Sequence, residues 1–220
     1  QVASLISSGM SEEEAKNSAQ ILKDAQEMLI KWEQNDSDVI ALWEKMNGWV
    51  YNGFERTYQS LNISFDHLYY ESNTYKVGKS EVENGLAEKK FYKKEDQSIW
   101  CDLSSYKLDD KLLIRSDGTS VYMTQDIGTA IQRFRDYPSL SGVVYTVGNE
   151  QNHHFNVLFK ILQKLDFEWA KQCHHLSYGM VELPEGKMKS REGTVVDADD
   201  LLSSVIDEAK KLTLERGHLE

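Results

Sequence analysis

Three positive side chains stand close together in a chain whose formal net charge is -11. Lys187, Lys189 and Arg191 fall within five residues, and a glycine stands on either side of the three. Glycine accepts backbone angles that other residues resist, so the segment 182–193 is expected to be a loop. A short cationic loop suits a polyanion such as a triphosphate, whereas most charge runs are merely solvated. The loop alone leaves both interpretations open.

A phenol and a carboxylate lie four residues apart, at Tyr122 and Asp126, near the start of an expected helix. Residues at this spacing share one face of a helix. Asp126 can hold a cationic group by a salt bridge, and Tyr122 can contact that group through its hydroxyl or its ring. The alternative is structural: Asp126 stabilises the helix N-terminus, and Tyr122 packs in the core.

A second polar group follows the β-branched run 143–147. Gly148 lets a ligand approach the backbone, and Gln151 can both donate and accept hydrogen bonds. His153 and His154 are neighbours, so they point to different sides of a helix and do not form a bidentate metal pair. No other spacing in the chain suits a metal, and we expect no protein-bound metal site.

The composition indicates a folded globular protein. The chain has 220 residues, is 40% hydrophobic and contains five Trp. A pI near 5.1 argues against a stand-alone nucleic-acid binder. Two distant cysteines indicate a reducing cytoplasm, and no apolar run approaches the roughly 20 residues of a membrane span. Because the sequence begins at Gln1 without Met, we expect a piece of a longer protein.

Strands and helices alternate from residue 111 onward. The expected strands are 111–115, 143–147 and 174–180, and the expected helices are 125–134, 152–165 and one from Asp199 onward. This alternation is typical of βαβ units with a parallel sheet, in which ligands bind at the carboxyl ends of the strands. The polar residues described above follow those ends, which favours one shared site. We expect the run 143–147 to be buried on both faces and Thr124 to cap a helix.

Residues 1–110 are expected to form a helical hairpin followed by a β-ribbon. Ser11 and Glu14 fit a capping box for a helix that ends near residue 35, and Ser37 is expected to cap the next helix. The Trp and Met stripe along these helices is expected to be core. Further strands are expected at 65–70, 89–94 and 99–103, with a helix at 79–87. The predicted parts of the chain are the domains 1–110 and 111–200, followed by residues 201–220 as the start of a further helix with a C-terminal tag remnant.

Five short segments occur in a fixed order along the second half of the chain. They are Asp117-Gly118-Thr119, Tyr122-Met123-Thr124-Gln125-Asp126, Val147-Gly148-Asn149-Glu150-Gln151, Tyr178-Gly179-Met180 and Lys187-Met188-Lys189-Ser190-Arg191-Glu192-Gly193. In this order and spacing the set resembles the arginyl-tRNA synthetases, a family of class I aminoacyl-tRNA synthetases. The resemblance runs from about residue 11 to the last helix.

The resemblance implies an α/β fold: the second half of a class I Rossmann-like parallel sheet, preceded by a helix-rich α+β insertion. It also implies an arginine–tRNA ligase, which activates arginine with ATP and transfers it to tRNA-Arg. ATP is then a substrate accompanied by Mg²⁺. The implied partners of the full-length enzyme are L-arginine, ATP and tRNA-Arg, without a membrane.

The family pattern assigns roles to individual positions. The arginine-binding positions are Tyr122, Asp126 and Gln151, and the ATP-binding positions are Gly148, His154, Gly179, Met180 and Lys187. The positions of the KMSKS loop, which act on the leaving pyrophosphate, are Lys187, Lys189, Ser190 and Arg191. Ser190 stands where the family usually has its second lysine, and either Lys189 or Arg191 can substitute.

The chain contains no HIGH-like motif, and the helical anticodon-binding domain is also missing from it. We therefore expect the isolated fragment to be inactive, and its exposed faces to favour self-association. Two alternatives remain. One is a non-catalytic module that binds tRNA or a partner through the lysines of 89–94. The other is a different class I synthetase.

Overall fold

The computed structural model describes residues 1–180, 182–183, 186–187 and 196–217. The chain divides into two compact units, Gln1–Ser64 and Phe65–Glu220, which are treated separately below. The domain boundaries expected at 110 and 200 stay predictions. The helices of the first unit are α1 (Val2–Ser7), α2 (Glu12–Ser18), α3 (Gln20–Glu33) and α4 (Ser37–Ser60).

Helix caps in the first unit agree in part with the sequence. Ser11 and Glu14 form the expected capping box: each backbone N–H donates to the other's side chain, at 3.0 and 3.3 Å. The single long helix expected after it is instead two, because Ala19 is extended between α2 and α3. The cap assigned to Ser37 was wrong. The Asp36 carboxylate accepts from the backbone N–H groups of Asp38 and Val39 at the start of α4, and Ser37 is already helical.

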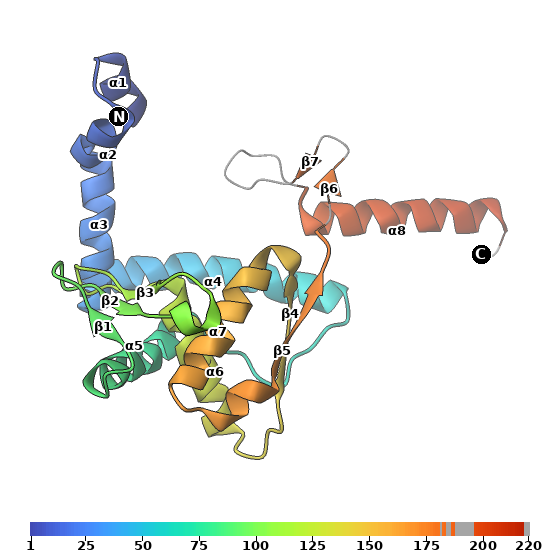
Figure 1. Ribbon diagram of the computed structural model, residues 1–220. Helices are drawn as coiled ribbons and strands as arrows, with labels where there is room; N and C mark the ends of the chain where they lie inside the picture. The colour runs from blue at the N-terminus through green and yellow to red at the C-terminus, as the bar shows by residue number, and fades with distance from the viewer. Residues whose placement is uncertain (181, 184–185, 188–195, 218–220) are drawn as a thin grey trace. The chain divides into compact units, whose positions relative to one another are not determined.

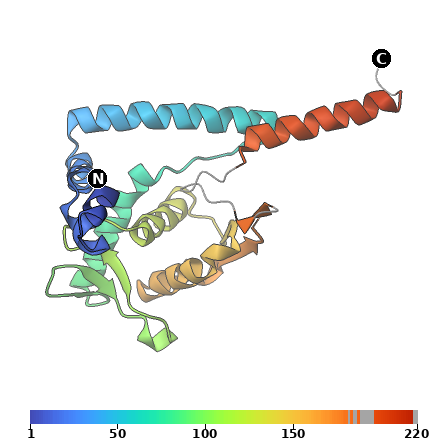
Figure 2. The same cartoon turned by 90° about the horizontal axis from the view of Figure 1, so that it is seen from above.

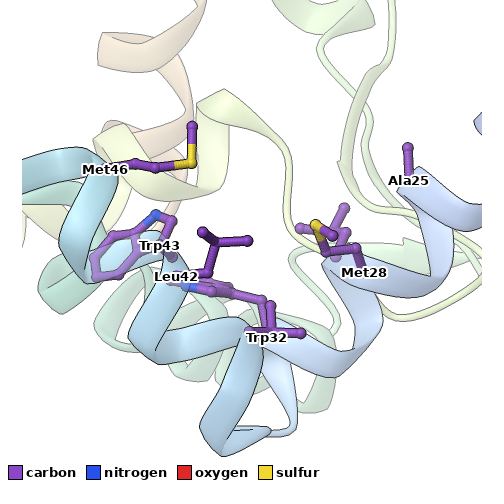
Figure 3. A pocket seen from close by; sticks show the side chains of 8 residues that line it. Ala25, Met28, Trp32, Leu42, Trp43 and Met46 are labelled. Carbon is purple, nitrogen blue, oxygen red and sulfur yellow. The ribbon is translucent and has the colours of Figure 1, made fainter.

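The apolar stripe of α3 and α4 lines an open groove instead of a closed core. Trp32 and Trp43 meet at the turn, with ring centroids 5.4 Å apart, and α4 then turns away from α3 (Figure 1). The expected αα-hairpin thus closes only at its turn. Met28, Leu42 and Met46 line a groove of about 380 Å³ with the two Trp (Figure 3), and Met46 is 52% exposed. No other described helix of this unit covers the apolar stripe of α3 and α4, so the stripe stays exposed.

The second unit holds the sheets. Its helices are α5 (Glu71–Ala87), α6 (Tyr122–Asp136), α7 (Asn152–Lys164) and α8 (Ala198–Glu215), with short 3-10 turns η1 (Ser104–Tyr106), η2 (Asn149–Gln151) and η3 (Glu168–Gln172). Its strands are β1 (Tyr92–Lys93), β2 (Ile99–Cys101), β3 (Lys111–Ile114), β4 (Val143–Gly148), β5 (Cys173–Tyr178), β6 (Glu182–Leu183) and β7 (Gly186–Lys187).

Pairing of the strands confirms the expected parallel sheet. β4 and β5 run parallel, from Val143 opposite Cys173 to Gly148 opposite Tyr178, and α7 connects them (Figure 1). β1, β2 and β3 form a separate antiparallel sheet, drawn in green in Figure 2, away from the yellow and orange β4–β5 pair. β6 and β7 form a short antiparallel pair.

Two local predictions were wrong. Residues 65–70 contain no strand, because this aromatic segment leads directly into α5, which begins at Glu71 instead of residue 79. Thr124 does not cap a helix, since α6 already begins at Tyr122. Thr124 is fully buried, and its hydroxyl donates to the Leu113 carbonyl of β3 at 2.5 Å. It therefore ties α6 to the small sheet.

Two glycines allow α5 and α6 to touch backbone to backbone. A Cβ added to Gly78 would lie 1.9 Å from the Thr124 carbonyl oxygen, and one added to Gly128 would lie 2.0 Å from that of Thr74. Real Cβ atoms are not found at such distances, so only glycine fits at either position. This close contact fixes where the start of α6 lies.

One face of the β4–β5 pair is covered and the other is bare. Arg133 of α6 and Phe155 of α7 both contact the Tyr145 ring, at 5.2 and 4.9 Å, so both helices cover the same face. On the other face Val144 is 61% exposed and Leu176 is 54% exposed. The expectation that residues 143–147 are buried on both faces was therefore wrong, because no described element covers the second face.

Stability is expected to fall at alkaline pH. Burial raises the pKa of the Cys101 thiol to about 11 and that of the Tyr145 hydroxyl to about 12. The folded state therefore holds these protons more tightly than the unfolded chain does. This stabilisation is complete below pH 9 and is lost as pH rises through 11 and 12. Urea unfolding midpoints at pH 8 and 10.5 measure it: the midpoint should drop, and drop less in Cys101→Ala. A flat profile contradicts the prediction.

Candidate active site

The carboxyl ends of β4 and β5 bring two predicted ATP-side residues together. Gly148 ends β4 and lies opposite Tyr178, the last residue of β5. Met180 then folds back over Gly148, where an added Cβ would lie only 2.8 Å from the Met180 sulfur. Gly148 therefore lets the chain after β5 close over the edge of the sheet. Gly179 is exposed and has open space around it.

The first turns of α6 carry Tyr122 and Asp126. Tyr122 is 75% exposed, which excludes the alternative that it packs in the core. The Asp126 side chain is 32% exposed, and the neighbouring Ile127 is fully buried. The Asp126 side chain is thus mostly buried, with the rest open to solvent. Such a carboxylate is well placed to meet a cation that arrives from solution.

His154 reaches Asp126 from the first turn of α7. Its Nε2 lies 2.6 Å from Asp126 Oδ2, and its side chain is 21% exposed. His153 is exposed and takes no part in this contact. The contact joins a residue predicted on the arginine side to one predicted on the ATP side. Neither helical spacing nor motif order indicated that these two side chains meet.

Glu71, at the start of α5, adds a second carboxyl group near this pair. Partial burial and the negative charge of Asp126 raise the pKa of Glu71. Glu71 of α5 thus feels the charge of Asp126 of α6, and the imidazole of His154 from α7 contacts Asp126. No sequence motif singles out Glu71, because it reaches the site only through the packing of α5 on α6.

A hollow of about 340 Å³ opens beside Tyr122 and His154. Trp100, Asp110 and Lys111 line its opposite side, so the small antiparallel sheet forms one wall. The hollow is large enough for an amino-acid side chain and is bordered by aromatic, acidic and basic groups. These three wall residues were also missed by the sequence motifs.

The remaining predicted residues are Gln151 and those of the segment 187–191. Gln151 is exposed at the end of η2, directly before α7. The backbone of Lys187 lies in β7. Lys189, Ser190 and Arg191 lie outside the described residues. Within the described part of the chain, no group of three or more His, Cys, Asp or Glu side chains is placed to hold a metal ion. Among the described helices, none combines the length and apolar character needed to cross a membrane.

Comparison with known proteins gives a consistent result. The family model "tRNA synthetases class I (R), catalytic domain" matches residues 6–219. The arginine–tRNA ligase of Bacteroides fragilis is 58% identical over 220 residues, which cover 100% of this chain and 37% of that protein. That of Flavobacterium psychrophilum is 57% identical, with the same coverage of 100% and 37%. The chain thus spans about 37% of the length of these relatives.

Solved structures show the same fold. The arginyl-tRNA synthetase of Plasmodium falciparum matches with a TM-score of 0.68 at 23% identity, over 93% of this chain and 33% of that chain. The Thermus thermophilus enzyme matches with a TM-score of 0.57 at 17% identity, over 98% of this chain and 44% of that one. The expected α/β fold class is confirmed. The chain therefore belongs to the family of class I (R) tRNA synthetase catalytic domains.

Proposed function

We propose that this chain is part of the catalytic domain of an arginine–tRNA ligase, which joins L-arginine to tRNA-Arg with ATP as a substrate. The observation that carries the proposal is the partly exposed Asp126 carboxylate, held by His154 beside the carboxyl edge of the β4–β5 sheet. Relatives at 57–58% identity over the whole chain carry the name arginine–tRNA ligase, which supports the choice of amino acid.

The side chains proposed for arginine suit a guanidinium group. A guanidinium is planar and always charged, and it offers five N–H donors in a fixed fork. Asp126 supplies the opposite charge, Tyr122 supplies an aromatic ring and a hydroxyl, and Gln151 supplies an amide oxygen. This set rejects a neutral side chain of the same shape, because a partly buried carboxylate would then lack its partner.

ATP is proposed to bind along the sheet edge, accompanied by Mg²⁺. The arginine carboxylate then attacks the α-phosphate, and pyrophosphate leaves. A hydroxyl of the terminal adenosine of the tRNA next attacks the arginyl carbonyl of the arginyl-adenylate, and AMP leaves. Gly148 and Met180 would border the nucleotide, with Gly179 nearby, and the family pattern adds His154 to this group. Negative charge builds on the pyrophosphate as it leaves. The cations Lys187, Lys189 and Arg191, with the Ser190 hydroxyl, would stabilise it.

The alternative of a tRNA-binding module draws little support from the ribbon 89–94. Lys90 bridges Glu88 and Asp166, at 2.6 and 2.9 Å, and Lys94 lies over the Trp100 ring. These two lysines are engaged within the protein. A tRNA-charging function places the full-length enzyme in the cytoplasm. Exposed faces such as that of Val144 and Leu176 favour self-association of the isolated chain.

Pyrophosphate exchange into ATP, with arginine and tRNA present, tests the proposed function. The full-length enzyme should exchange at a rate that depends on arginine. The 220-residue chain alone should exchange at less than about 1% of that rate, because most of the enzyme's length lies outside it. Robust exchange by the isolated chain would contradict the proposed division of the site. Arginine-independent exchange by the full-length enzyme would contradict the choice of substrate.

A further inference from the structure

We propose that His154 is a positioning residue for arginine: it holds the Asp126 carboxylate in the orientation that receives the guanidinium. This inference rests on the proposed function and changes the role that the family pattern gave His154, which was to contact ATP. The reason for this assignment is the contact between the two side chains. His154 Nε2 lies 2.6 Å from Asp126 Oδ2, within the range of a strong hydrogen bond to a charged acceptor.

The backbones of Asp126 and His154 are held in place by packing that does not depend on the contact between their side chains. In α6, Asp126 lies between the buried Met123 and Ile127, which are 1% and 0% exposed. In α7, the residue after His154 is Phe155, which is 6% exposed and packs on Tyr145 with ring centroids 4.9 Å apart. The carboxylate of Asp126 would still be free to rotate about its own bonds. A hydrogen bond from α7 removes that freedom at the cost of one carboxylate oxygen.

The remaining carboxylate oxygen can then receive arginine. His154 engages Oδ2, and a carboxylate has two oxygens with several lone-pair positions. A neutral imidazole that donates from Nε2 leaves the carboxylate charge in place for the guanidinium. The carboxyl group of Glu71 lies near enough to be influenced by the same charge.

The two possible roles of His154 predict different kinetics. A residue that contacts ATP affects the KM for ATP. A residue that acts through Asp126 affects the KM for arginine and leaves the KM for ATP unchanged, with little change in kcat. In addition, its effect should vanish once the Asp126 charge has been removed, because the two side chains then act as one unit.

The experiment is steady-state kinetics of the full-length enzyme in pyrophosphate exchange with tRNA present. His154→Phe keeps a ring and removes the donor, so the KM for arginine should rise about tenfold, as expected for one hydrogen bond to a charged group. His154→Gln places an amide N–H near the Nε2 position and should restore the KM to within about threefold. His153→Phe is the matched control, since His153 is exposed in the same turn, and both KM values should stay unchanged.

Two results would overturn the proposal. One is a rise in the KM for ATP with an unchanged KM for arginine, which would return His154 to the ATP side. The other concerns the double variant His154→Phe with Asp126→Asn. If its fold increase in the KM for arginine equals the product of the two single fold increases, the two residues act independently. If His154→Phe does not fold, His154→Asn, whose amide falls short of Asp126, should give the same rise. A pyrophosphate-exchange rate of the wild-type enzyme that does not depend on arginine would instead refute the proposed function.

Discussion

Asp126→Asn in the full-length enzyme should raise the KM for arginine by at least about 30-fold. Removal of one partner from a partly buried, hydrogen-bonded charge pair costs about 2–5 kcal/mol, and each 1.4 kcal/mol is a factor of ten in affinity. The substitution keeps the size of the side chain, removes its charge and replaces one acceptor oxygen with an NH2 donor. The Asp126 side chain is 32% exposed, so screening by water favours the lower end of this range.

The control for this prediction lies at the other end of the same helix. Asp136 is exposed in the last turn of α6, and Asp136→Asn should leave the KM for arginine within about twofold. The KM for ATP should stay unchanged in both variants. If Asp126→Asn affected ATP and spared arginine, the arginine side of the site would be placed wrongly.

Gly128→Ala should destabilise the second unit by about 3 kcal/mol or more. The added Cβ would lie 2.0 Å from the Thr74 carbonyl oxygen and 2.6 Å from the Gly78 nitrogen. Both are backbone atoms and cannot swing aside, so α5 and α6 must separate. Overpacking typically costs 1–3 kcal/mol where flexible side chains absorb the strain, and rigid backbone places this site at the upper end.

Chemical unfolding of the 220-residue chain measures this effect. Gly53→Ala is the matched control, since Gly53 also lies inside a helix, α4, and has nothing within 4 Å of an added Cβ. That substitution should stabilise the chain by roughly 0.5–1 kcal/mol, through helix propensity alone. Equal effects of the two alanines would show that the α5–α6 contact is looser than described.

Local sequence patterns predicted those elements whose signal lies within their own residues. The β-branched run before Gly148 became β4, and the apolar periodicity after it became α7. The start of α5 could not be predicted, because Gly78 reads as a helix breaker. Only the backbone of α6, pressed against it, makes glycine a requirement there. The prediction that Thr124 caps a helix failed for a similar reason. Its hydroxyl donates to the Leu113 carbonyl of β3, and no local rule distinguishes such a contact from a cap.

The candidate site was predictable as a set of positions and not as a set of contacts. The i, i+4 spacing placed Tyr122 and Asp126 on one face, and the parallel sheet placed Gly148 at the carboxyl edge. The Asp126–His154 contact joins residues 28 apart on two helices, so it depends on how α6 and α7 pack over Tyr145. A one-dimensional pattern carries no such information.

The central claim is that the Asp126 carboxylate recognises the charge of the arginine side chain. Citrulline tests it, because it has nearly the shape of arginine but a neutral end group. The direct measurement is the ratio of kcat/KM for arginine to kcat/KM for citrulline, in tRNA charging by the full-length enzyme and by Asp126→Asn. We expect a ratio of about 1,000 or more in the wild type and a fall of at least tenfold in the variant. A wild-type ratio near one, or the same ratio in both enzymes, would contradict the claim.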